Sequence, residues 1–126
     1  MATILLVDDD PLKASLMTSL LSGRFDDVRR TADAAEALCL IEQPEFAGKL
    51  GLVISAHHTL GIGGPAFVAE LHERMPALPI LVVGAPSEAF DYCTDGPIAF
   101  LPRPLVAREM LLMTSRLLSK HNDAAA

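Results

Sequence analysis

Acidic and basic side chains stand where short apolar runs of this chain end. Asp8, Asp9 and Asp10 follow the run at 4–7, and Arg103 follows the run at 98–101. Three adjacent carboxylates repel one another and need a counter-charge, which a divalent cation held by oxygen ligands supplies. Acids are equally typical of a helix N-terminus, because the helix dipole favours them there. The sequence leaves both interpretations open, and Asp10 is better explained as a helix cap.

Two histidines, His57 and His58, lie just beyond another apolar run at 52–54. Together with Asp8 and Asp9 they provide the donor types of a transition-metal site. Adjacent residues of an extended segment point in opposite directions, so only one of the two histidines can face the acids. We therefore favour a solvated pair of loop histidines over a metal site.

The elements that position these residues are short strands alternating with helices. Apolar runs rich in branched side chains predict strands buried on both faces, at 4–7, 52–54 and 78–83, with weaker candidates at 28–31 and 98–101. Start and stop signals between them predict helices from Pro11 to about Leu21, from Asp33 to before Pro44, from Gly64 to before Pro76, around 87–90 (very short), and from Pro104 to about Lys120.

This alternation predicts an α/β fold with a five-stranded parallel sheet and helices on both faces, a (βα)5 flavodoxin-like arrangement. The site of such a sheet lies at the carboxyl ends of its strands. Arg103 is the basic residue that we expect at this end, close to Asp8 or Asp9. Residues 1–120 are predicted to form one domain, and 121–126 a flexible tail.

The composition excludes several classes of protein. The 126 residues are 51% hydrophobic and 21% charged, which is unlike a disordered chain. Ten basic against 16 acidic residues give a net charge of −6, so nucleic acid is not an expected partner. We see neither a signal peptide nor a membrane span, and Cys39 and Cys93 read as small apolar residues. The expectation is one cytoplasmic domain.

The whole chain resembles a bacterial response-regulator receiver domain, of the CheY-like type, over about residues 2 to 120. The stretches that carry the resemblance are Ile4-Leu-Leu-Val-Asp-Asp-Asp-Pro11, Leu52-Val-Ile-Ser55, Gly63-Gly64, Pro79-Ile-Leu-Val-Val83 and Phe100-Leu-Pro-Arg-Pro104. They occur in the order and near the spacing of the family. The resemblance implies the receiver fold and a role in two-component or phosphorelay signalling.

The resemblance also assigns roles to positions of this chain. Asp8 and Asp9 match the acids that hold a magnesium ion, and Phe100 matches the aromatic switch residue. The other three positions depart from the family: Ala56 stands where the phosphoacceptor aspartate is expected, Gly84 where a Thr or Ser senses the phosphoryl group, and Arg103 where a lysine binds it. A methyl group neither attacks a phosphoryl donor nor ligates a metal, so we expect magnesium binding to be weak or absent and no other cofactor.

Arg103 keeps the positive charge of the lysine but has a planar fork that suits a carboxylate. We therefore expect it to cross the pocket, where Ala56 and Gly84 leave room, and to bond Asp8 or Asp9. The alternative is that Arg103 points into solvent. By the resemblance, the Arg103–Pro104 bond is expected to be cis.

A surface then has to carry the function. Receiver domains commonly signal or dimerise through the fourth helix, fifth strand and fifth helix, and here the segment 84–103 looks shorter than usual. Helical periodicity places Val106, Met110, Met113 and Leu117 on the core side of the fifth helix. The polar side carries Arg108 and Arg116, and Leu105 and Leu112 interrupt it. These last four residues are the candidate interface for a partner or a second copy.

The leading hypothesis is a non-enzymatic pseudo-receiver that signals by protein–protein contact without phosphorylation. The first alternative is a receiver still phosphorylated at Asp8, Asp9, His57 or His58. The second is a flavodoxin-like protein that binds a small ligand or a metal. A DNA-binding role is not expected of the chain itself, and the sequence names neither its partner nor its pathway.

Overall fold

A five-stranded, all-parallel sheet in the order β2-β1-β3-β4-β5 forms the middle layer of the molecule. The structure is a computed structural model, and it describes the chain apart from residues 1, 58, 60, 93–95 and 126, with backbone only beyond residue 119. The strands are β1 (Thr3–Val7), β2 (Val28–Thr31), β3 (Leu50–Ala56), β4 (Ile80–Gly84) and β5 (Ile98–Pro102). All five predicted strands and the fold class are confirmed.

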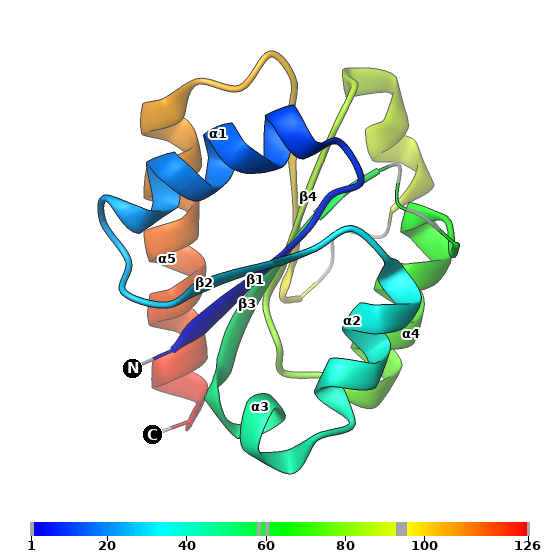
Figure 1. Cartoon of the computed structure of the whole chain (residues 1–126), viewed down its shortest axis with the longest axis vertical. Helices are drawn as coiled ribbons and strands as arrows, with labels where there is room; N and C mark the ends of the chain where they lie inside the picture. Colours follow the sequence, from blue (N-terminus) through cyan, green and yellow to red (C-terminus); the bar gives the residue numbers. More distant parts are fainter. Residues whose placement is uncertain (1, 58, 60, 93–95, 126) are drawn as a thin grey trace.

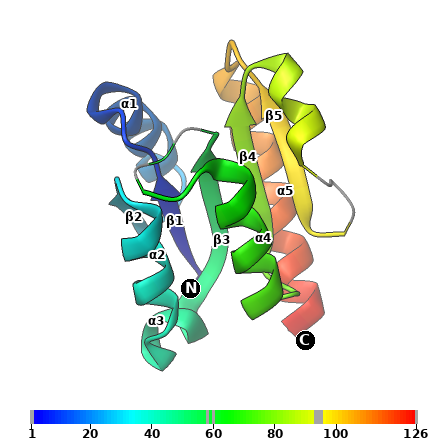
Figure 2. The same ribbon diagram turned by 90° about the vertical axis from the view of Figure 1, so that its right-hand side faces the viewer.

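Helices cover both faces of the sheet (Figures 1 and 2). On one face lie α1 (Pro11–Ser22) and α5 (Ala107–Ala125), and on the other lie α2 (Ala34–Ile41), α3 (Pro44–Lys49) and α4 (Gly64–Arg74). A short 3-10 helix, η1 (Pro86–Asp91), connects β4 to β5. The very short helix predicted around 87–90 therefore corresponds to η1, and it is as short as expected.

The strands form because their side chains alternate between two cores. Leu5 and Val53 pack with Phe67 of α4 in one core, while Leu6 and Ile54 pack with α1 and α5 in the other. All of these side chains are buried, which removes branched apolar surface from water on both faces. The sheet is thereby fixed in register, with the carboxyl ends of β1, β3 and β4 adjacent.

Two helix boundaries differ from the prediction. Pro44 was expected only to end a helix, but it also occupies the first turn of the additional helix α3, where its missing N–H costs nothing. The last helix begins at Ala107 rather than at Pro104, because the carbonyl of Val106 accepts the first helical hydrogen bond, from Met110 N (3.0 Å). The helix continues to Ala125, so the backbone at 121–125 is helical.

The buried face of α5 is also shifted from the prediction. Met110 and Leu117 are buried as expected, whereas Val106 is 51% exposed because it precedes the helix. Thr114 is fully buried instead, and the helical periodicity had not placed it on the core side. None of the described helices is long and apolar enough to cross a membrane.

Candidate functional site

The end of β1 places Asp8 in a largely buried position, with 7% of its surface exposed. Its Oδ1 accepts a hydrogen bond from the backbone N–H of Asp10 (3.0 Å). Asp10 caps α1, since its Oδ1 accepts from Leu12 N (3.0 Å) and Lys13 N (3.2 Å). The cap interpretation of Asp10 is confirmed.

The carboxylate of Asp8 is incompletely neutralised. Burial raises its pKa above the usual value, the backbone hydrogen bond from Asp10 lowers it, and the negative charges of Asp9 and Asp10 raise it again. Lys13 makes only a smaller, opposing contribution. Arg30 donates to the backbone oxygen of Asp8 (Nη2, 2.7 Å) and not to its carboxylate. Lys13 and Arg30 are basic residues at this end that the sequence analysis missed.

Ala56 ends β3 beside Asp8. Ser55 pairs with Val7 and Ala56 with Val83, so the methyl group lies between the ends of β1 and β4. The chemistry at this position is therefore that of a hydrocarbon. Within the described residues, no cluster of three or more His, Cys, Asp or Glu side chains is arranged to hold a metal. Asp8 and Asp9 supply two carboxylates at the expected place, which fits a magnesium ion only in part.

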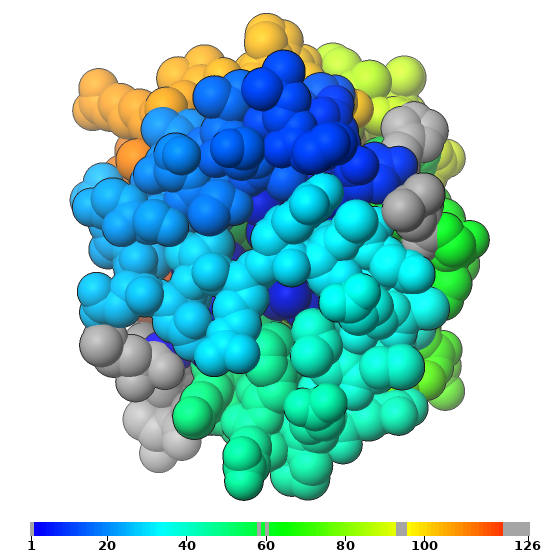
Figure 3. Space-filling view, in the orientation of Figure 1, coloured from blue at the N-terminus to red at the C-terminus, as the bar shows by residue number. Residues whose placement is uncertain are grey.

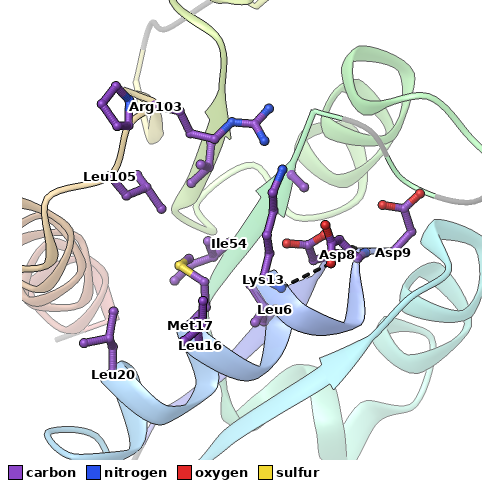
Figure 4. Close-up of a pocket in the computed structure, with 14 residues that line it drawn as sticks. Leu6, Asp8, Asp9, Lys13, Leu16, Met17, Leu20, Ile54, Arg103 and Leu105 are labelled. Carbon is purple, nitrogen blue, oxygen red and sulfur yellow. Dashed lines mark hydrogen bonds between the residues drawn. The ribbon is translucent and has the colours of Figure 1, made fainter.

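Arg103 contacts a carboxylate that the sequence analysis did not consider. Its Nη2 lies 3.8 Å from Oε1 of Glu88 in η1, and no ion pair joins it to Asp8 or Asp9, all three being described residues. The predicted bond from Arg103 across the pocket is therefore wrong. Figure 4 shows Arg103 approaching from the β5 side, with Lys13 reaching up from α1 between it and Asp8. The Arg103–Pro104 peptide bond is cis, as the resemblance implied.

The space beside Gly84 is not open, contrary to the expectation that it leaves room for Arg103. A Cβ atom built on Gly84 would lie 2.8 Å from Oε1 of Glu88, 3.2 Å from Cβ of His57 and 3.3 Å from Cζ of Phe100. The Glu88 carboxylate and the aromatic ring of Phe100 thus close on the end of β4. Glu88 accepts the backbone N–H of Ala85 (2.6 Å), as a glutamate at the third position of a helix commonly does.

His57 is part of this cluster rather than a solvated loop residue. Only 13% of its side chain is exposed, its Nδ1 lies 2.7 Å from the hydroxyl of Tyr92, and its Nε2 lies 3.2 Å from Oε2 of Glu88. The prediction of a solvated histidine failed because it ignored the side chains of η1. His58 lies outside the described residues.

Tyr92 links the histidine to the predicted switch residue Phe100. The rings of Tyr92 and His57 meet edge to face at 5.6 Å, and those of Tyr92 and Phe100 are tilted at 5.9 Å. Burial, followed by the charges of Glu88 and Asp91, raises the pKa of Tyr92, so its hydroxyl stays protonated. A glutamate three residues after Ala85, with Pro86 between them, is the signal that could have drawn attention to Glu88.

A cleft of about 570 Å³ opens from the acidic strand end between α1 and the β5–α5 loop. Figure 4 shows Met17 and Leu20 of α1 and Leu105 of the loop around it, with Asp8 and Asp9 at one end. Figure 3 shows α1 running across the surface. The helix exposes three leucines that were not predicted, Leu12, Leu16 and Leu20, and the last two of them line the cleft.

The four predicted interface residues divide into two groups. Leu112 is 47% exposed, and Arg108 and Arg116 are exposed, so these three are available at the surface of α5. Leu105 precedes the helix and is partly buried against the α1–α5 core, which corrects its predicted place on the polar side. Phe90 of η1, which the sequence analysis did not single out as an interface residue, is 91% exposed.

Comparison with known proteins places this fold and site in a class. No protein-family model matches the chain. It is 32% identical over 120 residues to response regulator protein FleR of Pseudomonas aeruginosa, and 28% identical over 124 residues to sensor kinase CckA of Brucella abortus. The matches cover 91% and 96% of this chain, but the chain spans only 24% and 13% of those relatives.

Among solved structures, a signal receiver domain of an HD domain-containing protein from Pseudomonas fluorescens Pf-5 aligns with a TM-score of 0.86 at 26% identity. The alignment covers 98% of this chain and 91% of that one. The fold is the α/β fold of solved signal receiver domains. The chain is a response-regulator receiver domain of the two-component systems.

Proposed function

We propose that this receiver domain signals through protein–protein contacts and without phosphorylation. The observation that carries the proposal is the methyl group of Ala56 at the end of β3, where the receiver pattern requires an aspartate. A nucleophile must lie within about an ångström of its productive position. Asp8 and Asp9 lie on the neighbouring strand, so neither is a good substitute for the missing aspartate. The contacts of both His57 nitrogens likewise oppose a phosphorylated histidine.

Magnesium binding is expected to be weak for the same reason. The ion prefers near-octahedral oxygen ligands and releases its water reluctantly. With Asp8 and Asp9 alone, the site supplies fewer charged ligands than the family pattern does. No enzymatic activity and no other cofactor belong to this proposal. We place the domain in the cytoplasm, where an exposed thiol such as that of Cys39 stays reduced.

Intact-protein mass spectrometry after incubation with acetyl phosphate and magnesium tests the proposal. The wild type should show no phosphoryl adduct, and an Ala56→Asp variant, run in parallel, controls for the reactivity of the donor. A stable adduct on the wild type would overturn the proposal, and peptide mapping would then separate Asp8, Asp9, His57 and His58.

The contact surface that we propose lies over η1, β5 and α5. Phe90 projects from η1 beside a shallow apolar depression lined by Tyr92, Phe100 and Pro102, and Leu112 is exposed on α5. An exposed aromatic side chain beside an apolar depression marks an interaction site more often than scattered apolar residues do. The occupant that we propose first is a second copy of the chain, which makes oligomeric state the readout.

Sedimentation of Phe90→Ser and Leu112→Asp variants tests this surface. If the wild type self-associates, both substitutions should weaken the association at least tenfold, whereas Leu12→Ser on the outer side of α1 should leave it unchanged. A wild type that is monomeric at millimolar concentration, or a loss of association only in Leu12→Ser, would exclude homodimerisation through this surface.

A second candidate function is the binding of a small apolar ligand in the cleft between α1 and the β5–α5 loop. The observation that favours it is the cleft volume of about 570 Å³, within the range of ligand sites, and a wall of leucine, isoleucine and valine side chains. A thermal-shift screen with small apolar compounds should then find stabilising ligands whose effect disappears in Leu105→Trp. Stabilisation that survives this substitution would place the ligand elsewhere.

A further inference from the structure

Glu88 directs its carboxylate from η1 into the strand ends, where it meets Ala85 at the N-terminus of η1, His57 after β3 and Arg103 after β5. Oε1 accepts the backbone N–H of Ala85 at 2.6 Å and lies 3.8 Å from Nη2 of Arg103. Oε2 lies 3.2 Å from Nε2 of His57. Only 18% of the Glu88 side chain is exposed. A carboxylate that is partly withdrawn from water and surrounded by donors is a bound anion in chemical terms.

The hydrogen atoms of this cluster can be assigned from its own contacts. A carboxylate can only accept, so the 3.2 Å contact with Glu88 places a hydrogen on Nε2 of His57. The hydroxyl of Tyr92, whose pKa is raised, keeps its proton and can donate it to Nδ1 of His57, 2.7 Å away. The chain of bonds from Tyr92 through His57 to Glu88 therefore has a donor and an acceptor at every step.

Gly84 shows that the carboxylate fills its site. A Cβ at this position would lie 2.8 Å from Oε1 of Glu88, closer than a real Cβ atom approaches a neighbour. The end of a glutamate side chain can move, but it would then leave the N–H of Ala85 and the guanidinium of Arg103. Glycine at position 84 and glutamate at position 88 are thus matched to each other.

From these contacts we infer that the N–H of Ala85, Nε2–H of His57 and the guanidinium of Arg103 form a carboxylate-binding site, and that its ligand is the Glu88 side chain of the same chain. The bound carboxylate fastens η1 to the strand ends and, through His57 and Tyr92, holds Phe100 in one arrangement. The inference is independent of the proposed function, because it involves no phosphodonor and concerns groups other than Ala56.

Asp91 provides a matched control. Its Oδ2 also faces Nε2 of His57, but at 3.9 Å, and 56% of its side chain is exposed. A carboxylate at that distance and exposure contributes little, because water screens it. If the site is specific for Glu88, Asp91→Asn should therefore behave like the wild type.

Chemical rescue tests the site. Glu88→Ala should raise the unfolding equilibrium constant about tenfold or more, because a partly buried set of charge-assisted hydrogen bonds is lost. Sodium formate should then restore most of this loss and should shift the Ala85 amide proton toward its wild-type position in the NMR spectrum. The same formate titration should leave the wild type and Asp91→Asn unchanged. Sodium chloride at equal ionic strength should not rescue Glu88→Ala.

Inorganic phosphate serves as the second probe. Rescue by phosphate and not by formate would overturn the assignment of a carboxylate site. Rescue by chloride would show only an effect of ionic strength and would also overturn it.

If Glu88→Ala does not fold, Glu88→Gln replaces it. The Ala85 amide proton must then move upfield, as expected when a neutral acceptor replaces a charged one, and an unmoved resonance would contradict the inference.

Gly84→Ala supplies an independent test by a double-mutant cycle with Glu88→Ala. In the wild type the added methyl should displace the carboxylate and raise the unfolding equilibrium constant about tenfold. In the Glu88→Ala background the effect of the methyl should fall several-fold, because its nearest obstacle is gone. Additive effects of the two substitutions would show that Glu88 does not occupy the space beside Gly84.

Discussion

At the scale of single residues, the site is defined by one missing carboxylate and one additional carboxylate. Ala56 provides neither a nucleophile nor a metal ligand beside Asp8. Glu88 brings a negative charge to the other side of the pocket, where it meets Arg103 and His57. The positive charge of Arg103 is therefore directed toward η1, and Asp8 lacks the counter-charge that the sequence led us to expect.

The first prediction concerns the burial of Asp8. Its folded-state pKa is raised, so its contribution to stability is complete below the unfolded pKa near 3.8 and is lost as pH rises through the folded value. Asp8→Asn keeps an oxygen for the Asp10 N–H and removes the charge. It should be more stable than the wild type at pH 7, by on the order of 1 kcal/mol.

Urea unfolding in the presence of EDTA at several pH values between 3.5 and 7 measures this effect. The difference between Asp8→Asn and the wild type should grow with pH, while the exposed Asp26→Asn control should follow the wild type. A difference that stays constant across this range would mean that Asp8 does not titrate as its burial requires.

The second prediction concerns the close approach of Tyr92 to Gly64. A Cβ on Gly64 would collide with the hydroxyl of Tyr92 and the backbone oxygen of His57, and the latter accepts the Gly64 N–H (3.1 Å). Gly64→Ala should therefore destabilise the domain by about 2 kcal/mol, because backbone atoms cannot move aside cheaply. The adjacent Gly63 has no atom within 4 Å of such a Cβ, so Gly63→Ala is the control, and denaturant unfolding of both gives the comparison. Equal stability of the two variants would argue against the packing of Tyr92 on this loop.

At the scale of elements, strands were predictable and side-chain partners were not. Runs such as 4–7 and 78–83 predict buried strands because a strand covered on both faces needs apolar residues throughout. The strand-end rule correctly gathered Asp8, Ala56 and Arg103 at one edge of the sheet. It cannot say which carboxylate Arg103 meets, since that depends on η1, whose Glu88 reaches back over only three residues to Ala85.

The third helix of the molecule shows a related limit. Proline was interpreted only as a terminator at Pro44, although it also fits the first turn of a new helix. The buried side of α5 was misplaced at Val106 because Leu105 and Val106, the two residues after Pro104, belong to the loop. Both errors arise at helix boundaries marked by a proline, because a proline is compatible both with the end of one helix and with the start of the next.

The third prediction uses the two sides of α5. Met110 is fully buried between α5 and the sheet, so Met110→Ala leaves a cavity and should cost about 2 to 5 kcal/mol. Leu112 is 47% exposed, and Leu112→Ala should cost less than about 1 kcal/mol. Thermal unfolding of the two variants at one protein concentration compares them. A similar loss in both would mean that Leu112 is buried in solution, as it would be in a tight dimer.

At the scale of the whole molecule, the strand-end site is open on its β1 side and closed on its β4 side. The β1 end retains acidic residues and opens into the cleft along α1, whereas the β4 end is closed by Glu88, His57 and Tyr92. Phe100 lies under the closed end, next to the surface formed by η1 and β5. The arrangement of that surface should therefore be set by residues of the chain itself, whether or not a phosphodonor is present.

The most direct measurement of this claim is a pair of amide NMR spectra of the wild type, without and with magnesium and acetyl phosphate. We predict that the resonances of Gly84, Ala85 and Phe100 stay in place, and that any magnesium-dependent shifts are small and confined to Asp8, Asp9 and their neighbours. A second set of resonances from η1 and β5 that appears with acetyl phosphate would show a switch driven by phosphorylation and would exclude a surface that is set by the chain alone.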